Sequence, residues 1–130
     1  MKLEQQCCSL KLAQKLKELG VEQESLFIWS THTEPPTLWW EPALNEKAGY
    51  TKDSLSSAFT IAELGEMLPW EVGGKILTVG KNVSGGWVVY YRTNVLGAAV
   101  ADSRILDQVG DTEADARAKM FIFLLENKLI

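Results

Sequence analysis

Residues 59–64 are Phe59-Thr60-Ile61-Ala62-Glu63-Leu64, and this segment fixes the start of a central helix. Thr60 is expected to be the N-cap residue, with Glu63 completing a capping box. Phe59 precedes the cap and is placed to contact Leu64 as a hydrophobic staple. The helix is predicted to end at Pro69, whose ring cannot continue the backbone ladder. This helix divides the chain into two parts, each of which carries a hairpin pattern.

The hairpin after the helix is predicted from two β-rich segments, Lys75 to Gly80 and Trp87 to Thr93. The connection ends in Gly85-Gly86, and glycines suit the positive φ values of tight turns. Both faces of the second strand carry bulky side chains in Trp87-Val88-Val89-Tyr90-Tyr91. We therefore expect a sheet that is covered on both sides, or on one side and by a partner.

The hairpin before the helix is predicted over Ser25 to Thr31 and Thr37 to Glu41, with a break at Glu34-Pro35-Pro36. Neighbouring residues of a strand point to opposite faces, so Trp39 and Trp40 are not expected to share one face. One indole is then covered by another layer, a partner or a ligand. Residues 42–57 show no sustained period and are predicted to form a loop.

Two further helices are predicted near the ends of the sequence. Ser9 is expected to cap the first and Gly20 to end it, and the apolar face of that helix carries Leu12, Leu16 and Leu19. Thr112 is expected to cap the last, and Asn127 to be its left-handed C-terminal residue. The apolar face of the last helix is predicted to consist of Ala114, Ala118, Phe121 and Leu125, widened by Ala116, Met120 and Phe123.

These elements predict an α+β fold with the order α-β-β-α-β-β-(β)-α. The optional strand is Gly97 to Ala101, and Asp102 to Gly110 is expected to be a loop. Short connections favour a mostly antiparallel sheet on which the helices pack in a sandwich-like arrangement. The length of 130 residues predicts a single domain over residues 1–130.

The composition favours a soluble chain that folds unaided, with 46% hydrophobic and 23% charged residues. The net charge of −4 argues against general nucleic-acid binding, which depends on neutralising phosphates. Cys7 and Cys8 are adjacent and suit reduced thiols better than a disulfide. No signal-peptide or membrane-spanning pattern is found, so we expect a cytoplasmic protein.

A family resemblance rests on three features of the second half. They are the segment Ser57 to Pro69, the Gly86-Trp87 pair, and Thr112 to Met120 continued by Leu124 to Asn127. Over roughly residues 55–130 the chain resembles small uncharacterised proteins of phages and prophages, and is similar to the phage ABA-sandwich domain. The resemblance implies helices covering a sheet, and a bacterial cytoplasm as the location. It implies no activity and no catalytic residues.

Catalytic and metal-binding patterns are weak. His32 is the sole histidine and lies in the expected hairpin loop, where a solvated turn residue explains it. A structural zinc site normally takes four Cys or His ligands, and this chain has three such residues, two of them adjacent. The carboxylate pairs Glu63 with Glu66 and Glu113 with Asp115 lie where capping and the helix dipole explain them. We expect no catalytic residues, no metal and no cofactor.

The five tryptophans are the most unusual feature of the composition. Trp is enriched in binding hot spots, and Trp39, Trp40 and Trp70 are predicted to contribute to a binding surface. The leading hypothesis is a non-enzymatic phage or prophage accessory protein that binds a host or phage protein, or associates with itself. An alternative is sequestration of a nucleotide-like small molecule, with Arg92 or Arg104 meeting a phosphate. A third is an enzyme with an unassigned acid–base site.

Overall fold

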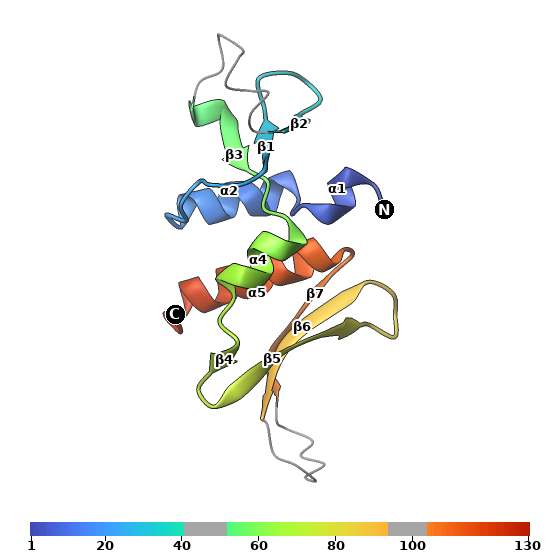
Figure 1. Ribbon diagram of the computed structural model, residues 1–130, viewed down its shortest axis with the longest axis vertical. Coiled ribbons are helices and arrows are strands. Elements are labelled where there is room, and N and C mark those ends of the chain that lie inside the picture. Colours follow the sequence, from blue (N-terminus) through green and yellow to red (C-terminus); the bar gives the residue numbers. More distant parts are fainter. Residues whose placement is uncertain (41–51, 94–103) are drawn as a thin grey trace.

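The structure, a computed structural model, describes residues 1–40, 52–93 and 104–130. Its described part contains four α-helices and two antiparallel sheets, which confirms the predicted α+β class. The sheets lie at opposite ends of the molecule, with the longer helices between them (Figure 1). The helices are α1 (Leu3–Gln6), α2 (Leu10–Glu18), α4 (Ile61–Met67) and α5 (Glu113–Glu126).

The first sheet has the strand order β2-β1-β3, with β1 (Phe27–Ser30), β2 (Thr37–Trp40) and β3 (Leu55–Ser57). The β1–β2 pair confirms the predicted first hairpin. The predicted loop over residues 42–57 is wrong at its end, because a 3₁₀ turn η1 (Lys52–Ser54) leads into β3. Residues 42–51 of that predicted loop lie outside the described residues.

The sequence did not indicate β3 because its serines have low strand propensity. Ser56 and Ser57 are nevertheless buried and pair with Trp29 and Ile28 of β1. On the other edge of β3, a backbone group bonds to a side chain, since Lys17 Nζ donates to the carbonyl oxygen of Leu55 at 2.6 Å. Tertiary pairing thus overrides the local preference here.

The second sheet has the order β4-β5-β6-β7, with β4 (Glu71–Val72), β5 (Lys75–Lys81), β6 (Trp87–Thr93) and β7 (Arg104–Gly110). The β5–β6 pair confirms the predicted second hairpin, and β4 is an additional short strand. On β6, Val89 and Tyr91 are buried beneath the helices, whereas Val88 and Tyr90 of the opposite face are half-buried.

The prediction of a loop over Asp102 to Gly110 is wrong, because Arg104–Gly110 form β7. The strand lies at the edge of the sheet, where Asp107 is exposed. Its pairing with β6 shifts register between Val89 and Tyr91, which hides the regular period of a strand. The optional strand Gly97 to Ala101 lies outside the described residues.

All three predicted N-cap residues stand at helix starts, and two of them accept a capping hydrogen bond with their side chains. Thr60 Oγ1 accepts from the backbone N–H of Glu63 at 3.2 Å, and Glu63 Oε1 accepts from the N–H of Thr60 at 2.9 Å. Thr112 Oγ1 accepts from the N–H of Asp115 at 3.1 Å. Ser9 is the N-cap residue of α2, but its side chain makes no capping hydrogen bond.

At the helix ends, the prediction for Gly20 is confirmed and the prediction for Asn127 is wrong. Gly20 follows α2 with a φ of 85°, as expected. Asn127 is the C-cap of α5 with a φ of −96°, so its predicted left-handed conformation is wrong. Lys128 takes that conformation instead, with a φ of 54°. The N–H of Leu129 bonds to the carbonyl oxygen of Leu124, which completes the turn and outweighs the strain at Lys128.

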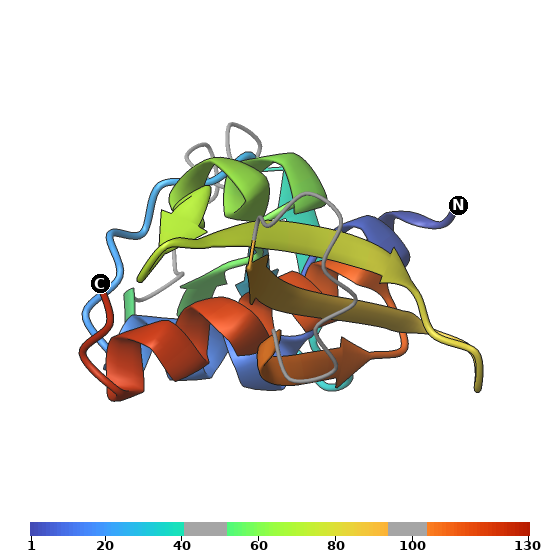
Figure 2. The same cartoon turned by 90° about the horizontal axis from the view of Figure 1, so that it is seen from below.

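The core lies around α5, which contacts both the four-stranded sheet and the other long helices. Figure 2 shows α5 beside α2 and against the sheet. The alanines Ala114, Ala116 and Ala118 are fully buried, which allows close approach of α5 to its neighbours. The larger fully buried side chains include Tyr91, Phe59, Leu16, Leu64, Met120 and Leu124.

Candidate functional site

The paired tryptophans of β2 lie on opposite faces of the three-stranded sheet. Trp39 is the register partner of Ile28, and Trp40 is the partner of Phe27. Trp39 is half-buried, and its Nε1–H donates to Thr37 Oγ1 at 2.6 Å. Trp40 remains 57% exposed. Of the two indoles, Trp40 is therefore the exposed one.

Trp70 lies at the other end of the molecule, immediately before β4 (Figure 1). Its side chain is 70% exposed. The structure does not bring Trp70 together with Trp39 and Trp40, because the two sheets are separated by the helices. The predicted tryptophan surface is thus two separate exposed positions.

The two predicted arginines come together in the sheet. Arg92 of β6 and Arg104 of β7 are direct register partners, and Arg92 is exposed.

The residues with nucleophilic or acid–base chemistry are not assembled into a site. Cys7 and Cys8 are fully buried, and burial raises the pKa of Cys7 to about 11 and of Cys8 to about 12. A thiol reacts as its thiolate, so both are poor nucleophiles at neutral pH. His32 is exposed in the β1–β2 connection. Within the described ranges, no three His, Cys, Asp or Glu residues lie together as metal ligands.

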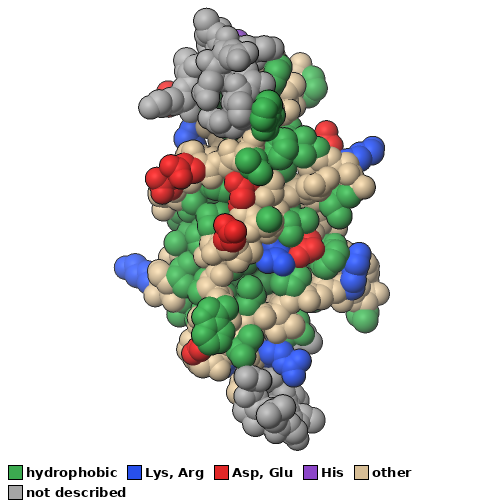
Figure 3. Space-filling model, in the orientation of Figure 1, with side chains coloured by type: hydrophobic (Ala, Val, Ile, Leu, Met, Phe, Trp, Pro, Cys, Tyr) green, Lys and Arg blue, Asp and Glu red, His purple; other side chains and the backbone are tan. Residues whose placement is uncertain are grey.

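A hollow of about 510 Å³ lies between α4, α5 and the connection from α2 to β1. We call it the acid-rimmed groove, because four glutamates and no lysine, arginine or histidine line it within the described part of the chain. On the face in Figure 3, acidic side chains lie among hydrophobic ones over the region of α4. The lining residues are Leu19, Gly20, Val21, Glu22, Glu24, Phe59, Glu63, Glu66, Met67, Phe121 and Leu125.

The groove separates apolar and acidic groups. Phe59 and Phe121 are buried at its base, while Met67 and Leu125 are half-buried and reach the surface. One of its carboxylates is fixed, because Glu63 Oε2 accepts from the backbone N–H of Leu26 at 3.2 Å. The groove therefore offers an apolar contact surface with negative charge at its margin.

Sequence reasoning missed the groove, although one signal for it was present. Glu63 and Glu66 were both assigned to the start of a helix, and only Glu63 has that role. Glu66 lies in the second half of α4 and lines the groove. The i, i+3 spacing places the two carboxylates on one face, but the apolar base comes from distant segments.

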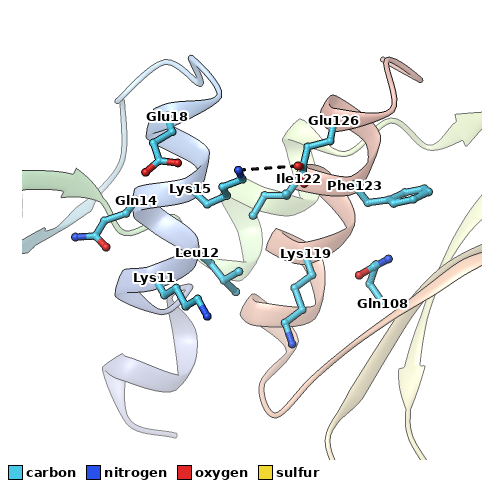
Figure 4. A pocket seen from close by; sticks show the side chains of 10 residues that line it. All are labelled: Lys11, Leu12, Gln14, Lys15, Glu18, Gln108, Lys119, Ile122, Phe123 and Glu126. Carbon is cyan, nitrogen blue, oxygen red and sulfur yellow. Dashed lines mark ion pairs between the residues drawn. The ribbon is translucent and has the colours of Figure 1, made fainter.

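A second hollow of about 510 Å³ lies between α2 and α5 (Figure 4). We call it the lysine cleft, since three lysines from the two helices line it. Its other polar groups are two glutamates and two glutamines, and its apolar wall consists of leucine, isoleucine and phenylalanine. The lining residues are Lys11, Leu12, Gln14, Lys15, Glu18, Gln108, Lys119, Ile122, Phe123 and Glu126.

No family model, curated protein or solved structure matches this chain. None of the helices in residues 1–40, 52–93 and 104–130 has the length and apolar character needed to cross a membrane.

Proposed function

We propose that this protein is a non-enzymatic binding protein that acts by contact with another protein. The observation that carries the proposal is the acid-rimmed groove, with its apolar base and four glutamates. The resemblance to phage and prophage proteins supplies the proposed context, in which the protein is an accessory factor in a bacterial cytoplasm and its partner belongs to the host or the phage.

The chemistry of the groove selects the partner. Apolar contact would come from the base and the half-buried Met67 and Leu125, which suit the apolar side chains of an amphipathic helix. Positive charges on the same segment would meet the glutamates and accelerate association. The proposed partner therefore presents an amphipathic segment that carries lysines or arginines.

A labelled model helix tests this proposal. The probe is a peptide with leucines at i, i+3, i+4 and i+7 spacing and lysines elsewhere, and its matched probe has glutamate in place of every lysine. We expect saturable binding of the lysine peptide in fluorescence anisotropy and no binding of the glutamate peptide. Binding of both peptides with equal affinity would contradict the proposal.

Matched variants locate the binding. The side chains of Glu22 and Glu66 are exposed and have no interaction partner among the described residues. Changing both to glutamine should weaken binding, because each exposed ion pair is worth about 0.2–1 kcal/mol. The control changes Glu4 and Glu34, which are exposed outside the groove, and should leave the affinity unchanged. Equal losses in the two double variants would place the peptide elsewhere.

Self-association is a second candidate for the same class of function. The observation that favours it is the exposure of Trp40 and Trp70, at 57% and 70%, because large exposed aromatic side chains are typical of interface anchors. Their positions at opposite ends of the molecule would allow each copy to contact two others. Native mass spectrometry of the purified protein reports the number of subunits directly, and a spectrum of monomers alone would count against this candidate.

A further inference from the structure

We propose that the lysine cleft binds a small organic anion, in which a carboxylate or phosphate group is joined to a flat apolar body. This activity is separate from the proposed protein contact, because the cleft and the acid-rimmed groove share no lining residue. The volume of about 510 Å³ lies within the range of small-molecule sites, which is about 300–1,000 Å³.

One end of the cleft is positively charged. Lys11 of α2 and Lys119 of α5 extend toward this same end (Figure 4). Lys119 Nζ donates to the carbonyl oxygen of Val109 at 2.8 Å, which holds its position and leaves two further N–H donors. Lys11 is exposed and has no interaction partner among the described residues. Two ammonium groups are therefore available to one anionic group.

The other end of the cleft carries one lysine and two glutamates, so its net charge is negative. Lys15 Nζ lies 3.9 Å from Glu126 Oε2 across the cleft, and the two side chains are 42% and 48% exposed. Glu18 lies at the same end (Figure 4). An anionic group is disfavoured near these carboxylates, so the cleft has a defined polarity. The charged group of a ligand is directed to Lys11 and Lys119.

The middle of the cleft supplies the apolar contact. Leu12 of α2 and Ile122 of α5 line it between the two helices, whereas the half-buried Phe123 lines it from the side of α5 that faces away from α2 (Figure 4). A planar apolar body would cover Leu12 and Ile122 and remove their surface from water. A simple inorganic anion covers none of them. The site therefore discriminates in favour of an anion with an apolar body.

The test compares three probes: 1-naphthyl phosphate, inorganic phosphate and uncharged 1-naphthol. Calorimetry on the full chain measures affinity, and amide shifts in NMR spectra locate binding. We expect 1-naphthyl phosphate to bind at least about tenfold more tightly than either other probe, because charge and apolar contact both contribute. The amide shifts should concentrate in residues 11–18 and 119–126. Equal affinity for inorganic phosphate, or shifts located elsewhere, would overturn the proposal.

Two variants test the charged end. Lys11→Glu changes an exposed side chain that makes no contact needed for folding, and should lower the affinity for 1-naphthyl phosphate about tenfold or more. Lys119→Gln should also weaken binding. The matched control is Lys2→Glu, which changes an exposed lysine outside the cleft and should leave the affinity unchanged. Unchanged affinity in Lys11→Glu, or an equal loss in Lys2→Glu, would overturn the assignment.

Discussion

The backbone N–H of Ser9 donates a 2.7 Å hydrogen bond to Oδ1 of Asp115 and so joins the start of α2 to the first turn of α5. Asp115 thus makes a hydrogen bond at the start of each helix, since its own N–H donates to Thr112 Oγ1, the N-cap of α5. Both long helices that form the lysine cleft are fixed relative to each other at this point.

Replacing Asp115 with alanine should lower the free energy of unfolding by about 1–3 kcal/mol, because the N–H of Ser9 would lose a charged acceptor in a partly buried position. Chemical denaturation of the two proteins measures the difference. The control is Asp111→Ala, which changes a nearby exposed carboxylate and should alter stability by less than about 0.5 kcal/mol. Equal effects of the two variants would show that the contact between Ser9 and Asp115 does not stabilise the fold.

Local sequence patterns predicted the parts of the fold that depend on neighbouring residues. The capping box at Thr60 and Glu63, the cap at Thr112 and both hairpins have signals within a few residues, and the structure confirms them. β3 was missed because its serines are stabilised by pairing with β1, which is distant in the sequence, and β7 was missed because its pairing with β6 shifts register. Pairing of this kind leaves no period in the sequence.

The candidate sites were harder to predict than the fold, for the same reason. The groove combines Phe59 and Phe121, and the cleft combines Leu12 and Ile122, so each needs segments that are distant in the sequence. The positions of single residues could be predicted more readily than the two sites. The period of a strand correctly separated Trp39 from Trp40, but it carried no information on the distance to Trp70.

The buried thiols should be unreactive in the native protein. Because burial raises the pKa of both thiols, a disulfide reagent at pH 8 should label neither Cys7 nor Cys8 until denaturant is added. Two thiols should then react, as the sequence contains two cysteines. Rapid labelling of the native protein would contradict the burial of this segment.

The same groups predict a loss of stability at alkaline pH. The folded-state pKa values, about 11 for Cys7 and about 12 for Cys8 and Tyr91, lie above the ordinary values of 9.0 for the thiols and 10.0 for the phenol. Protons are therefore held more tightly in the folded state, and the stabilisation is complete below pH 9 and lost as the pH rises toward 12. Each group lowers stability by up to about 1.4 kcal/mol per pH unit in its window.

Denaturation curves between pH 8 and pH 11 measure this loss. A Cys7→Ala and Cys8→Ala double variant removes both thiol contributions and should show a shallower decline than the unchanged protein. Identical slopes for the two proteins would mean that thiol ionisation does not drive the alkaline loss.

The exposed tryptophans should contribute to association and little to folding. Trp40→Ser and Trp70→Ser are expected to change the free energy of unfolding by less than about 0.5 kcal/mol, because both side chains are largely in solvent. If copies associate through these side chains, the subunit number in native mass spectra should fall in these variants.

Trp29→Phe is the matched comparison for the exposed tryptophans. The Nε1–H of Trp29 donates to the carbonyl oxygen of Cys8 at 2.9 Å, and the side chain packs against the core. The variant should cost about 1–3 kcal/mol, since the partly buried carbonyl oxygen loses its donor. Greater destabilisation by Trp40→Ser than by Trp29→Phe would contradict the positions of these side chains.

A pair of strand glycines tests the close approach of β7 and α5. A Cβ atom on Gly110 would lie 2.6 Å from the backbone nitrogen of Ala116 and 3.0 Å from the carbonyl oxygen of Thr112. Both are backbone atoms at the start of a buried helix, so they cannot move aside as a flexible side chain would. Gly110→Ala should therefore cost about 1–3 kcal/mol or more, the usual cost of overpacking.

Gly80→Ala provides the control for that variant. Gly80 lies in β5, and a Cβ atom there meets nothing within 4 Å. We expect a change of less than about 0.5 kcal/mol, or a small gain from the reduced entropy of the unfolded chain. Thermal and chemical denaturation of both variants should thus separate them clearly. Equal midpoints would contradict the tight contact that makes glycine necessary where β7 turns into α5.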